Sequence, residues 1–360
     1  MQAIAILPAR WTVLVVLTGL LLPPSLSGQQ VERYTVSGDE VAIYNLAGDV
    51  RIEPGTGSAV TAELVRGGAE AARLKVARSE VDGVETLRVI YPGDRIRYAG
   101  LSDGSSTQLR VRDDGTFGGD DEHGRQRDGR RVTISPQAGG LDAHANLRVA
   151  VPQGRRVAVY LAVGKVAITN VSGDLHIDAA SAPVTASGTR GELSIDVGSG
   201  AVEVTQARGD LSVDTGSGPV RVTDSRGKSV SIDTGSGEIN ASDIRSSQLS
   251  IETGSGDIQV TGATAPHVSL ETGSGSVTAD IGGEVWEVSV ETGSGDVTLR
   301  VPPTLGAEVD IETSSGEIET DFAVEVTRHA RDHMTGRIGD GRGKIDIETG
   351  SGGIKLVKAQ

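Results

Sequence analysis

The sequence has no cysteine among its 360 residues, which excludes disulfide bonds, thiolate metal sites and a lipid anchor on cysteine. Aromatic residues are scarce as well. Two Trp, two Phe and five Tyr leave little material for the stacking platforms of a carbohydrate-binding groove. Basic residues number 34 against 49 acidic ones, a net charge of −15, whereas nucleic-acid phosphates are bound by cationic patches. We therefore expect no nucleic-acid partner, and no residue pattern points to a cofactor.

The sequence has one long apolar run, residues 11–22, close to its N-terminus. Arg10 precedes the run and the small residues of PPSLSG follow it, an order typical of a secretory signal peptide. The run is shorter than the ~20 residues that span a bilayer. We predict a signal peptide over residues 1–28, no transmembrane segment in the mature chain, and export to the periplasm, the cell surface or the extracellular medium.

Glycine, in contrast, is abundant, and many of the 50 glycines belong to a repeat. The stretch SIETGSGDIQV at residues 250–260 has relatives in SIDVGSG, SVDTGSG, SIDTGSG, SLETGSG, SVETGSG, DIETSSG and DIETGSG. From residue 198 to residue 293, successive turns begin 18 to 20 residues apart. The first glycines of the Gly-Ser-Gly turns are Gly198, Gly216, Gly235, Gly254, Gly273, Gly293 and Gly350.

Hydrophobic alternation inside each unit predicts strands. In LSVDTGSGPVRV, Leu211 and Val213 share one face, and Val220 and Val222 continue that face after the turn. A unit this small cannot bury its apolar face alone, but stacked units enclose a continuous core between two strand layers. We predict an all-β fold, a β-solenoid of two-strand coils of about 19 residues preceded by an irregular strand-rich β region. A chain of separate β-hairpins is the alternative, and the near-constant spacing favours stacking.

The repeated turn has an architectural explanation, because glycine reverses the backbone at positive φ without steric cost and lets adjacent coils approach closely. On that ground we expect Gly254→Val to destabilise the fold. A phosphate-binding loop would need a following helix with a Lys, and the sequence shows neither. The threonines before the turns should stack at the edge of the core and bond to backbone groups. They are Thr215, Thr234, Thr253, Thr272, Thr292, Thr313 and Thr349.

One acidic residue per coil shares the outward parity, so stacking would align these carboxylates about 4.8 Å apart. The row is either a solubilising surface that discourages aggregation or a weak collector of divalent cations. Its members are Asp196, Asp214, Asp233, Glu252, Glu271, Glu291, Glu312 and Glu348. We expect no dedicated metal site; a low-affinity cation row would comprise Asp214, Asp233, Glu252, Glu271 and Glu291.

The segments outside the repeat divide the chain. Residues 29–153 are strand-rich but irregular, and their charged, Gly-rich stretch 113–131 is predicted to be a disordered loop. Residues 154–360 form the predicted repeat domain, which an insertion at 321–344 interrupts. This insertion should protrude from the array or cap it.

A second metal candidate lies in the insertion. His329 and His333 would share one face if the segment were helical, but two histidines make an incomplete zinc site. A polar loop or a turn of cap helix is the better interpretation.

The order of strands and turns resembles a known family. The stretches YNLAGDVRIE, VAVPQGRRVAVYLAVGKVAITNVSGDLHID and GRIGDGRGKIDIETGSGGIKL are similar to the DUF4097 "putative adhesins", exported bacterial proteins of repeated β-strands. This resemblance implies a β-solenoid with an envelope or surface role, and it carries no catalytic residues. We therefore expect a non-enzymatic scaffold or adhesin-like binding module whose partner is an unknown envelope protein or surface ligand. The alternatives are a polysaccharide-active β-helix enzyme, which would need converging carboxylates, and a calcium-dependent β-solenoid.

Overall fold

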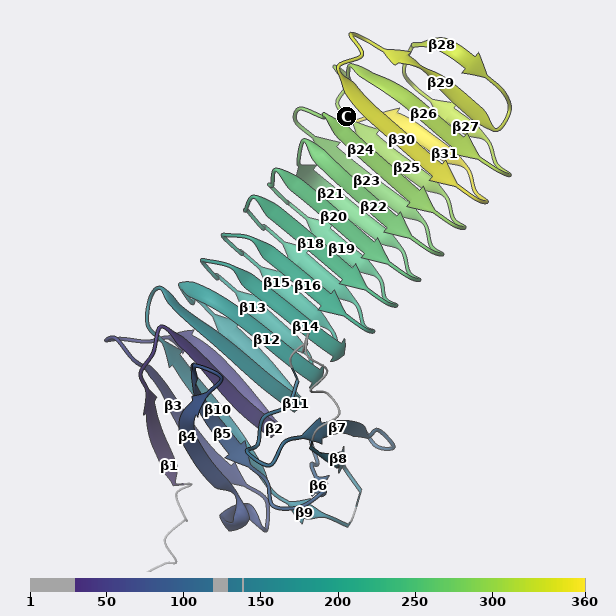
Figure 1. Ribbon diagram of the computed structural model, residues 1–360. Helices are drawn as coiled ribbons and strands as arrows, with labels where there is room; N and C mark the ends of the chain where they lie inside the picture. The colour runs from purple at the N-terminus through teal and green to yellow at the C-terminus, as the bar shows by residue number, and fades with distance from the viewer. Residues whose placement is uncertain (1–29, 119–128, 138, 360) are drawn as a thin grey trace, which may run out of the picture. The chain divides into compact units, whose positions relative to one another are not determined.

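The structure, a computed structural model, describes residues 30–118, 129–137 and 139–359 (Figure 1). Within these residues the regular structure consists of β-strands and one short 3-10 turn, and Val31–Gln360 form one compact unit. No helix in the described part of the chain is long and apolar enough to cross a membrane. The predicted signal peptide lies outside the described residues, as do residues 119–128 of the predicted loop.

The N-terminal strands are irregular in length and partly antiparallel. Four short ones, β6 to β9, form a separate small sheet. The stretch GGAEAARL holds the 3-10 turn η1. The elements are β1 (Val31–Val36), β2 (Glu40–Pro54), β3 (Val60–Gly67), η1 (Ala71–Arg73), β4 (Lys75–Val81), β5 (Val84–Ile90), β6 (Arg95–Arg97), β7 (Thr107–Val111), β8 (Arg130–Ser135), β9 (Leu141–Asp142) and β10 (His144–Val151).

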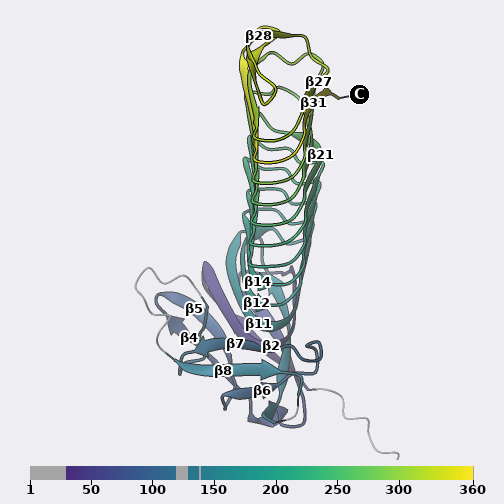
Figure 2. The ribbon, with the colours of Figure 1, turned by 90° about the vertical axis from the view of Figure 1, so that its right-hand side faces the viewer.

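The repeats form a β-solenoid, which confirms the predicted fold class. Each coil gives one strand to a first ladder and one to a second, and both ladders are parallel and in register. Figure 2 shows the two layers edge-on. The first sheet contains β12 (Gly173–Ser181), β14 (Leu193–Ser199), β16 (Leu211–Thr215), β18 (Ser229–Thr234), β20 (Gln248–Thr253), β22 (His267–Thr272), β24 (Glu287–Thr292), β26 (Ala307–Thr313) and β30 (Gly343–Thr349). The second contains β13 (Val184–Ser187), β15 (Val202–Thr205), β17 (Val220–Thr223), β19 (Ile239–Ser242), β21 (Ile258–Thr264), β23 (Val277–Gly282), β25 (Val297–Val301), β27 (Ile318–Thr320) and β31 (Ile354–Lys358).

The core lies between the two sheets, where the alternation of the sequence places it. Leu211 and Val213 of β16 are 2% and 1% exposed, and Val220 and Val222 of β17 are fully buried. One apolar face per strand therefore meets the other across the coil, and the in-register ladders repeat this contact from coil to coil.

The ladders continue below the repeat into the predicted N-terminal region. The long strand β11 (Arg155–Thr169) contributes to both sheets and pairs in parallel with β2 over most of its length. The first part of β2 then pairs with β5 and its last part with β10, so the two layers diverge. The division at residue 153 thus remains a prediction, because strands from both sides of it share the same ladders.

The last coil is not where the sequence order puts it. Strand β30 pairs with β24 on one side and with β26 on the other, and β31 lies likewise between β25 and β27. The coil over residues 343–358 is therefore inserted between two coils that precede it in sequence. Beyond β26, the hairpin of β28 (Val324–His329) and β29 (His333–Ile338) pairs antiparallel with the otherwise exposed edge of β26. This hairpin caps the first sheet, so the expectation of a helical cap turn is wrong.

Candidate functional site

The most regular feature of the surface is a column of carboxylates on the outer side of the first sheet. Because the ladder is in register, the outward acidic residue of each coil is the direct partner of that in the next coil. In spatial order the column is Asp178, Asp196, Asp214, Asp233, Glu252, Glu271, Glu291, Glu348 and Glu312. The sequence pattern predicts all of them except Asp178. The inserted coil reverses the order of Glu312 and Glu348.

A column of serines runs beside the carboxylates, two residues earlier in each strand. Its members are Ser194, Ser212, Ser231, Ser250, Ser269 and Ser289. We call the surface formed by the acidic column and the serine column the acidic face. Sequence analysis did not single out these serines, although the pattern Ser-x-Asp/Glu recurs with the period of the coils.

Repetition places like charges next to each other on this face. Neighbouring strands lie about 4.8 Å apart, so each adjacent pair of carboxylates repels by about 0.9 kcal/mol in water before salt screening. At Asp233, burial raises the pKa, and the charges of Glu252 and Asp214 raise it further. The acidic face is therefore a surface on which protons, cations or a basic partner relieve repulsion.

Aromatic rings replace the carboxylates at the lower end of the column. Tyr160 is the ladder partner of Asp178, and Tyr44 of β2 is the partner of Tyr160. The two tyrosine rings stack with centroids 4.3 Å apart and planes 4° apart, and Phe117 contacts Tyr44 edge-on at 5.8 Å. Burial raises the pKa of both tyrosines, so they remain neutral phenols. The acidic face ends here on an uncharged, packed surface.

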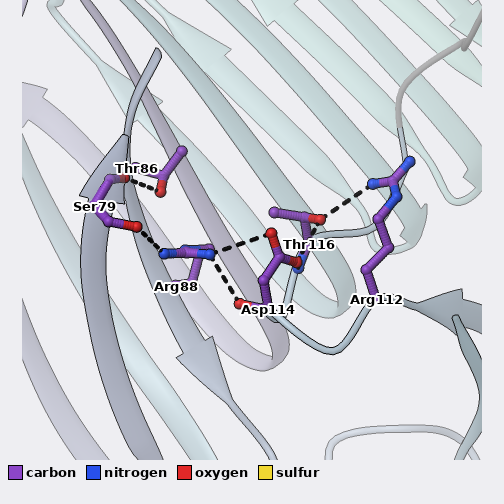
Figure 3. A network of polar contacts seen from close by, with 6 residues as sticks. All are labelled: Ser79, Thr86, Arg88, Arg112, Asp114 and Thr116. Atoms are coloured by element: carbon purple, nitrogen blue, oxygen red, sulfur yellow. Dashed lines mark hydrogen bonds and ion pairs between the residues drawn. The ribbon is translucent and has the colours of Figure 1, made fainter. Parts of the chain in front are cut away.

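A buried arginine lies below the tyrosines, because Arg88 of β5 is the ladder partner of Tyr44. Arg88 is 5% exposed, donates to the backbone carbonyl of Asp114 at 3.1 Å, and pairs with the Asp114 carboxylate at 3.3 Å (Figure 3). Thr116 donates to the same carboxylate from its backbone nitrogen at 2.9 Å and from its hydroxyl at 2.8 Å. Burial alone would raise the pKa of Asp114, but these hydrogen bonds and the charges of Arg88 and Arg112 lower it.

This network corrects one expectation from the sequence. Residues 113–131 were predicted to be a disordered loop, yet Thr116 and Phe117 are 2% and 4% exposed and pack against the strands. The charged composition misled the prediction because Asp114 is held by Arg88, which is distant in sequence. Residues 119–128 of the same stretch lie outside the described residues.

The upper end of the column is closed by a histidine. His333 of β29 is the antiparallel partner of Glu312, and its Nε2 lies 2.8 Å from Oδ1 of Asp310. His329 belongs to the adjacent strand β28, where its ladder partner is Met334, so the two histidines are not on one helical face. Among residues 30–118, 129–137 and 139–359, no group of three or more His, Asp or Glu side chains is placed to hold a metal ion.

The Gly-Ser-Gly turns stack at one edge of the coils, but the first glycine is not the left-handed one. Positive φ occurs at the second glycine of the turn, as at Gly256 with φ of 144°, whereas Gly254 is outside that region. A Cβ on Gly254 would instead meet the carbonyl oxygen of Gly235 at 2.5 Å. The first glycines therefore stand where adjacent coils approach closely, which is one of the two reasons expected from the sequence; the other reason, positive φ at Gly254, was wrong. Those first glycines are Gly198, Gly216, Gly235, Gly254, Gly273, Gly293 and Gly350.

The threonines before the turns do face the edge of the core, as predicted. All seven are at most 1% exposed. Thr272 donates from its hydroxyl to the carbonyl of Gly256 in the preceding coil at 3.0 Å, and Thr253 makes the same bond to Gly237 at 3.2 Å. The hydroxyl of Thr234 is the exception, because it is buried without a hydrogen-bond partner.

At the opposite edge of the coils lies a column that sequence analysis missed. Arginines one coil apart face each other through parallel bridges; they are Arg190, Arg208, Arg226 and Arg245. Asp224 pairs with two of them, at 2.7 Å from Arg208 and 3.4 Å from Arg226. The signal was an arginine in the second turn at intervals of 18 and 19 residues, hidden by the more conspicuous glycines.

Comparison with known proteins gives a family match over part of the chain and no curated relative. A "putative lipid binding protein" from Parabacteroides distasonis is 12% identical, with 93% of this chain and 98% of that chain covered and a TM-score of 0.40. A "putative adhesin" from Bacteroides fragilis is 12% identical, with 92% and 97% covered and a TM-score of 0.36. No curated protein matches the chain significantly. The profile of the family described as Toastrack DUF4097 matches residues 185–357, which hold most of the coils, so the similarity to this family extends over that part of the chain.

Proposed function

We propose that this protein is an exported, non-enzymatic scaffold or adhesin-like binding module of the cell envelope. The observation that carries the proposal is the acidic face, where the same two side chains recur once per coil over successive ladder pairs. A repeating surface of this kind suits an extended or repeating partner, because every coil offers it the same contact. An envelope protein or a surface ligand is the partner class we infer.

The acidic face is poorly suited to acid–base catalysis. General acid–base pairs need two groups whose different environments separate their pKa values at one place. Here the carboxylates are evenly spaced and share nearly the same surroundings along the sheet. The arrangement supports binding over turnover.

Export is inferred from the N-terminal residues. The order of Arg10, the apolar run and the small residues before position 28 supports a cleaved signal peptide. The absence of cysteine is compatible with any compartment, so the proposal depends on the signal itself. N-terminal sequencing of protein secreted by the producing cell should give a chain that begins near Gln29, and a chain that retains Met1 would contradict export.

Two variants with the same change in charge test the binding role. The acidic-face variant carries Glu252→Gln, Glu271→Gln and Glu291→Gln, while the control carries Glu203→Gln, Glu238→Gln and Glu317→Gln away from that face. Co-sedimentation of the mature protein with washed cell envelopes measures binding. We expect the acidic-face variant to lose most of its binding and the control to retain it. Equal binding by both variants would contradict the proposal.

A turnover assay on envelope polysaccharides completes the test. Peptidoglycan and the other polysaccharides of the same envelopes are incubated with the mature protein, and released reducing ends are measured. No release is expected. Release that disappears when one carboxylate is replaced, with the fold intact, would show that the protein is an enzyme.

A further inference from the structure

A cleft with side chains of several kinds lies where the repeat is broken. Three connections meet there: residues 283–286 before β24, residues 302–306 before β26, and residues 339–342 before β30. They are neighbours because the last coil is inserted, with the amide of Gly343 donating to the carbonyl of Gly306 and that of Lys344 donating to Trp286, both at 2.8 Å. The cleft has a volume of about 640 Å³, within the range of small-ligand sites.

An exposed tryptophan forms one wall of this cleft. Trp286 is 56% exposed, and the only other Trp in the sequence is Trp11, within the predicted signal peptide. Its ring contacts His267 edge-on, with centroids 5.8 Å apart and planes 83° apart. In a chain with nine aromatic residues, an indole left in water forgoes the large gain that burial would give it. Such a ring has the features of a binding surface.

The rest of the cleft combines an apolar floor with polar groups of both signs. Val285 and Leu305 line it and are each 8% exposed. Glu284, Asp340 and Arg342 supply hydrogen-bond acceptors and donors, and Arg342 Nε lies 3.0 Å from Asp340 Oδ2. The side chains of that pair are 86% and 54% exposed, so both can reach a ligand.

The mixed signs select the chemistry of the ligand. A cation would gain from the indole and the two carboxylates but would meet Arg342, and an anion would meet Glu284 and Asp340. A neutral ring with many hydroxyls meets no like charge: its C–H face can lie on the indole, while its hydroxyls donate to carboxylates and accept from the guanidinium. We propose that this cleft binds a neutral carbohydrate, with one pyranose ring stacked on Trp286.

This site is separate from the acidic face and goes beyond the proposed function. Within the described coils, the columns repeat the same residue types, whereas the cleft combines residues from three connections whose sequences differ from one another and from the arginine-bearing turns lower in the array. The inserted coil therefore brings together a set of side chains that is not repeated from coil to coil. The scarcity of aromatic residues in the sequence argues against a carbohydrate-binding groove, but one well-placed tryptophan is enough for one sugar ring.

Fluorescence of the mature full chain tests the proposal, because Trp286 is then its single tryptophan. Tri-N-acetylchitotriose, cellotriose and maltotriose are titrated separately, with trilysine and tetramethylammonium as cationic probes. We expect a saturable blue shift with at least one trisaccharide and none with the cations. Calorimetry then measures trisaccharide binding by variants and by the parent protein. Trp286→Ala should weaken binding by about tenfold or more, as expected for a central aromatic contact. Glu284→Gln and Arg342→Gln should weaken it by several-fold, while Val326→Ala, at an exposed site of the capping hairpin, should leave it unchanged.

Three results would overturn the proposal. One is the lack of a saturable change with all three trisaccharides, and another is binding that survives Trp286→Ala in a variant that melts like the parent. The third is a response to the cationic probes without one to the sugars, which would make the cleft a cation site. Envelope binding by the acidic-face variant is measured independently, so failure of the cleft and failure of the proposed function are distinguishable.

Discussion

The N-terminal strands and the acidic column of the coils differ in the neighbours of their carboxylates. In the N-terminal strands carboxylates meet arginines: Arg66 donates to Glu32 at 2.5 Å and lowers its pKa, and Arg88 does the same for Asp114 within its network. In the coils, carboxylates stack on carboxylates, and the pKa of Asp233 is raised. Irregular strands can place opposite charges side by side, whereas on the acidic face each carboxylate faces the carboxylate of the next coil.

The two regions also fill their cores differently. Tyr91, 1% exposed, lies between the diverging layers of the N-terminal strands, where its hydroxyl donates to Asn45 Oδ1 at 2.7 Å. Asn45 in turn donates to the carbonyl of Ala145 at 2.7 Å. The coils use small aliphatic side chains, because each position must fit its copies above and below. The N-terminal strands therefore depend on individual polar contacts, and the coils depend on the fit of their backbones.

The largest effect should come from the backbone fit of the coils. Gly256→Ala places a Cβ 2.1 Å from the carbonyl oxygen of Gly237 at a φ of 144°, so we expect a loss of about 3 kcal/mol or more. Gly254→Val should also destabilise, through its contact with Gly235. Gly353→Ala is the control, since its Cβ would meet nothing closer than 3.6 Å. Thermal melting monitored by circular dichroism measures all three. A Gly256→Ala protein that melts with the control would refute the close-approach role.

The next largest effect should come from the individual polar contacts of the N-terminal strands. Arg88→Met removes the partner of Asp114 while preserving much of the side-chain volume, and we expect a loss of about 2 kcal/mol. Arg221→Met, at an exposed site on β17, should change stability by less than about 0.5 kcal/mol. Denaturant titration compares the two. Similar midpoints would mean that the network in Figure 3 contributes little to the fold.

A smaller effect distinguishes two members of one column in the coils. Thr272→Val removes a hydroxyl that donates to Gly256, so it should cost about 1 kcal/mol. Thr234→Val removes a buried hydroxyl without a partner and should be neutral or stabilising. The shapes of the two substitutions are the same, and melting midpoints measured in parallel report the sign of each. Equal losses of stability in the two variants would show that the hydrogen bond of Thr272 does not stabilise the fold.

The periodic part of this molecule could be predicted from its sequence, and the contacts between distant segments could not. Alternation and turn spacing located the strands, the buried threonines and the acidic column, because these depend on neighbours within one coil. The insertion of the coil over 343–358 depends on which edge the returning strand meets, and no local pattern encodes that choice. The Trp286 cleft follows from this insertion, so it was invisible for the same reason. Asp114 was misassigned because its partner Arg88 lies on another strand.

The pH dependence of the two regions should have opposite signs. The raised pKa of Asp233 means that the folded state binds its proton more readily, so its charge destabilises at neutral pH and this penalty disappears as the pH falls through that pKa. Asp233→Asn should therefore raise the melting temperature at pH ~7, by an amount equivalent to less than about 1 kcal/mol, and lose this advantage below pH ~4. The pKa of Asp114 is lowered in the folded state, so its carboxylate stabilises the fold at pH values above its unfolded pKa. This stabilisation is lost as the pH falls, and Asp114→Asn should therefore lower the melting temperature at neutral pH. If both variants shift the melting temperature at neutral pH in the same direction, the carboxylates of the two regions do not contribute to stability with opposite signs.

The smallest expected effect concerns cations on the acidic column. Calcium takes six to eight oxygen ligands, and a flat row offers one or two carboxylates to each ion, with water completing the shell. Calcium and sodium chloride at matched ionic strength should therefore raise the melting temperature by similar amounts, about 1–2 °C, because both act by screening repulsion. Glu252→Gln with Glu271→Gln should reduce both increments together, while Glu203→Gln with Glu238→Gln should leave them unchanged. A midpoint that jumps at micromolar calcium and falls again with chelator at constant ionic strength would show that the column is a specific metal site. The coils would then resolve their repulsion by binding an ion, as the N-terminal strands resolve theirs with arginine.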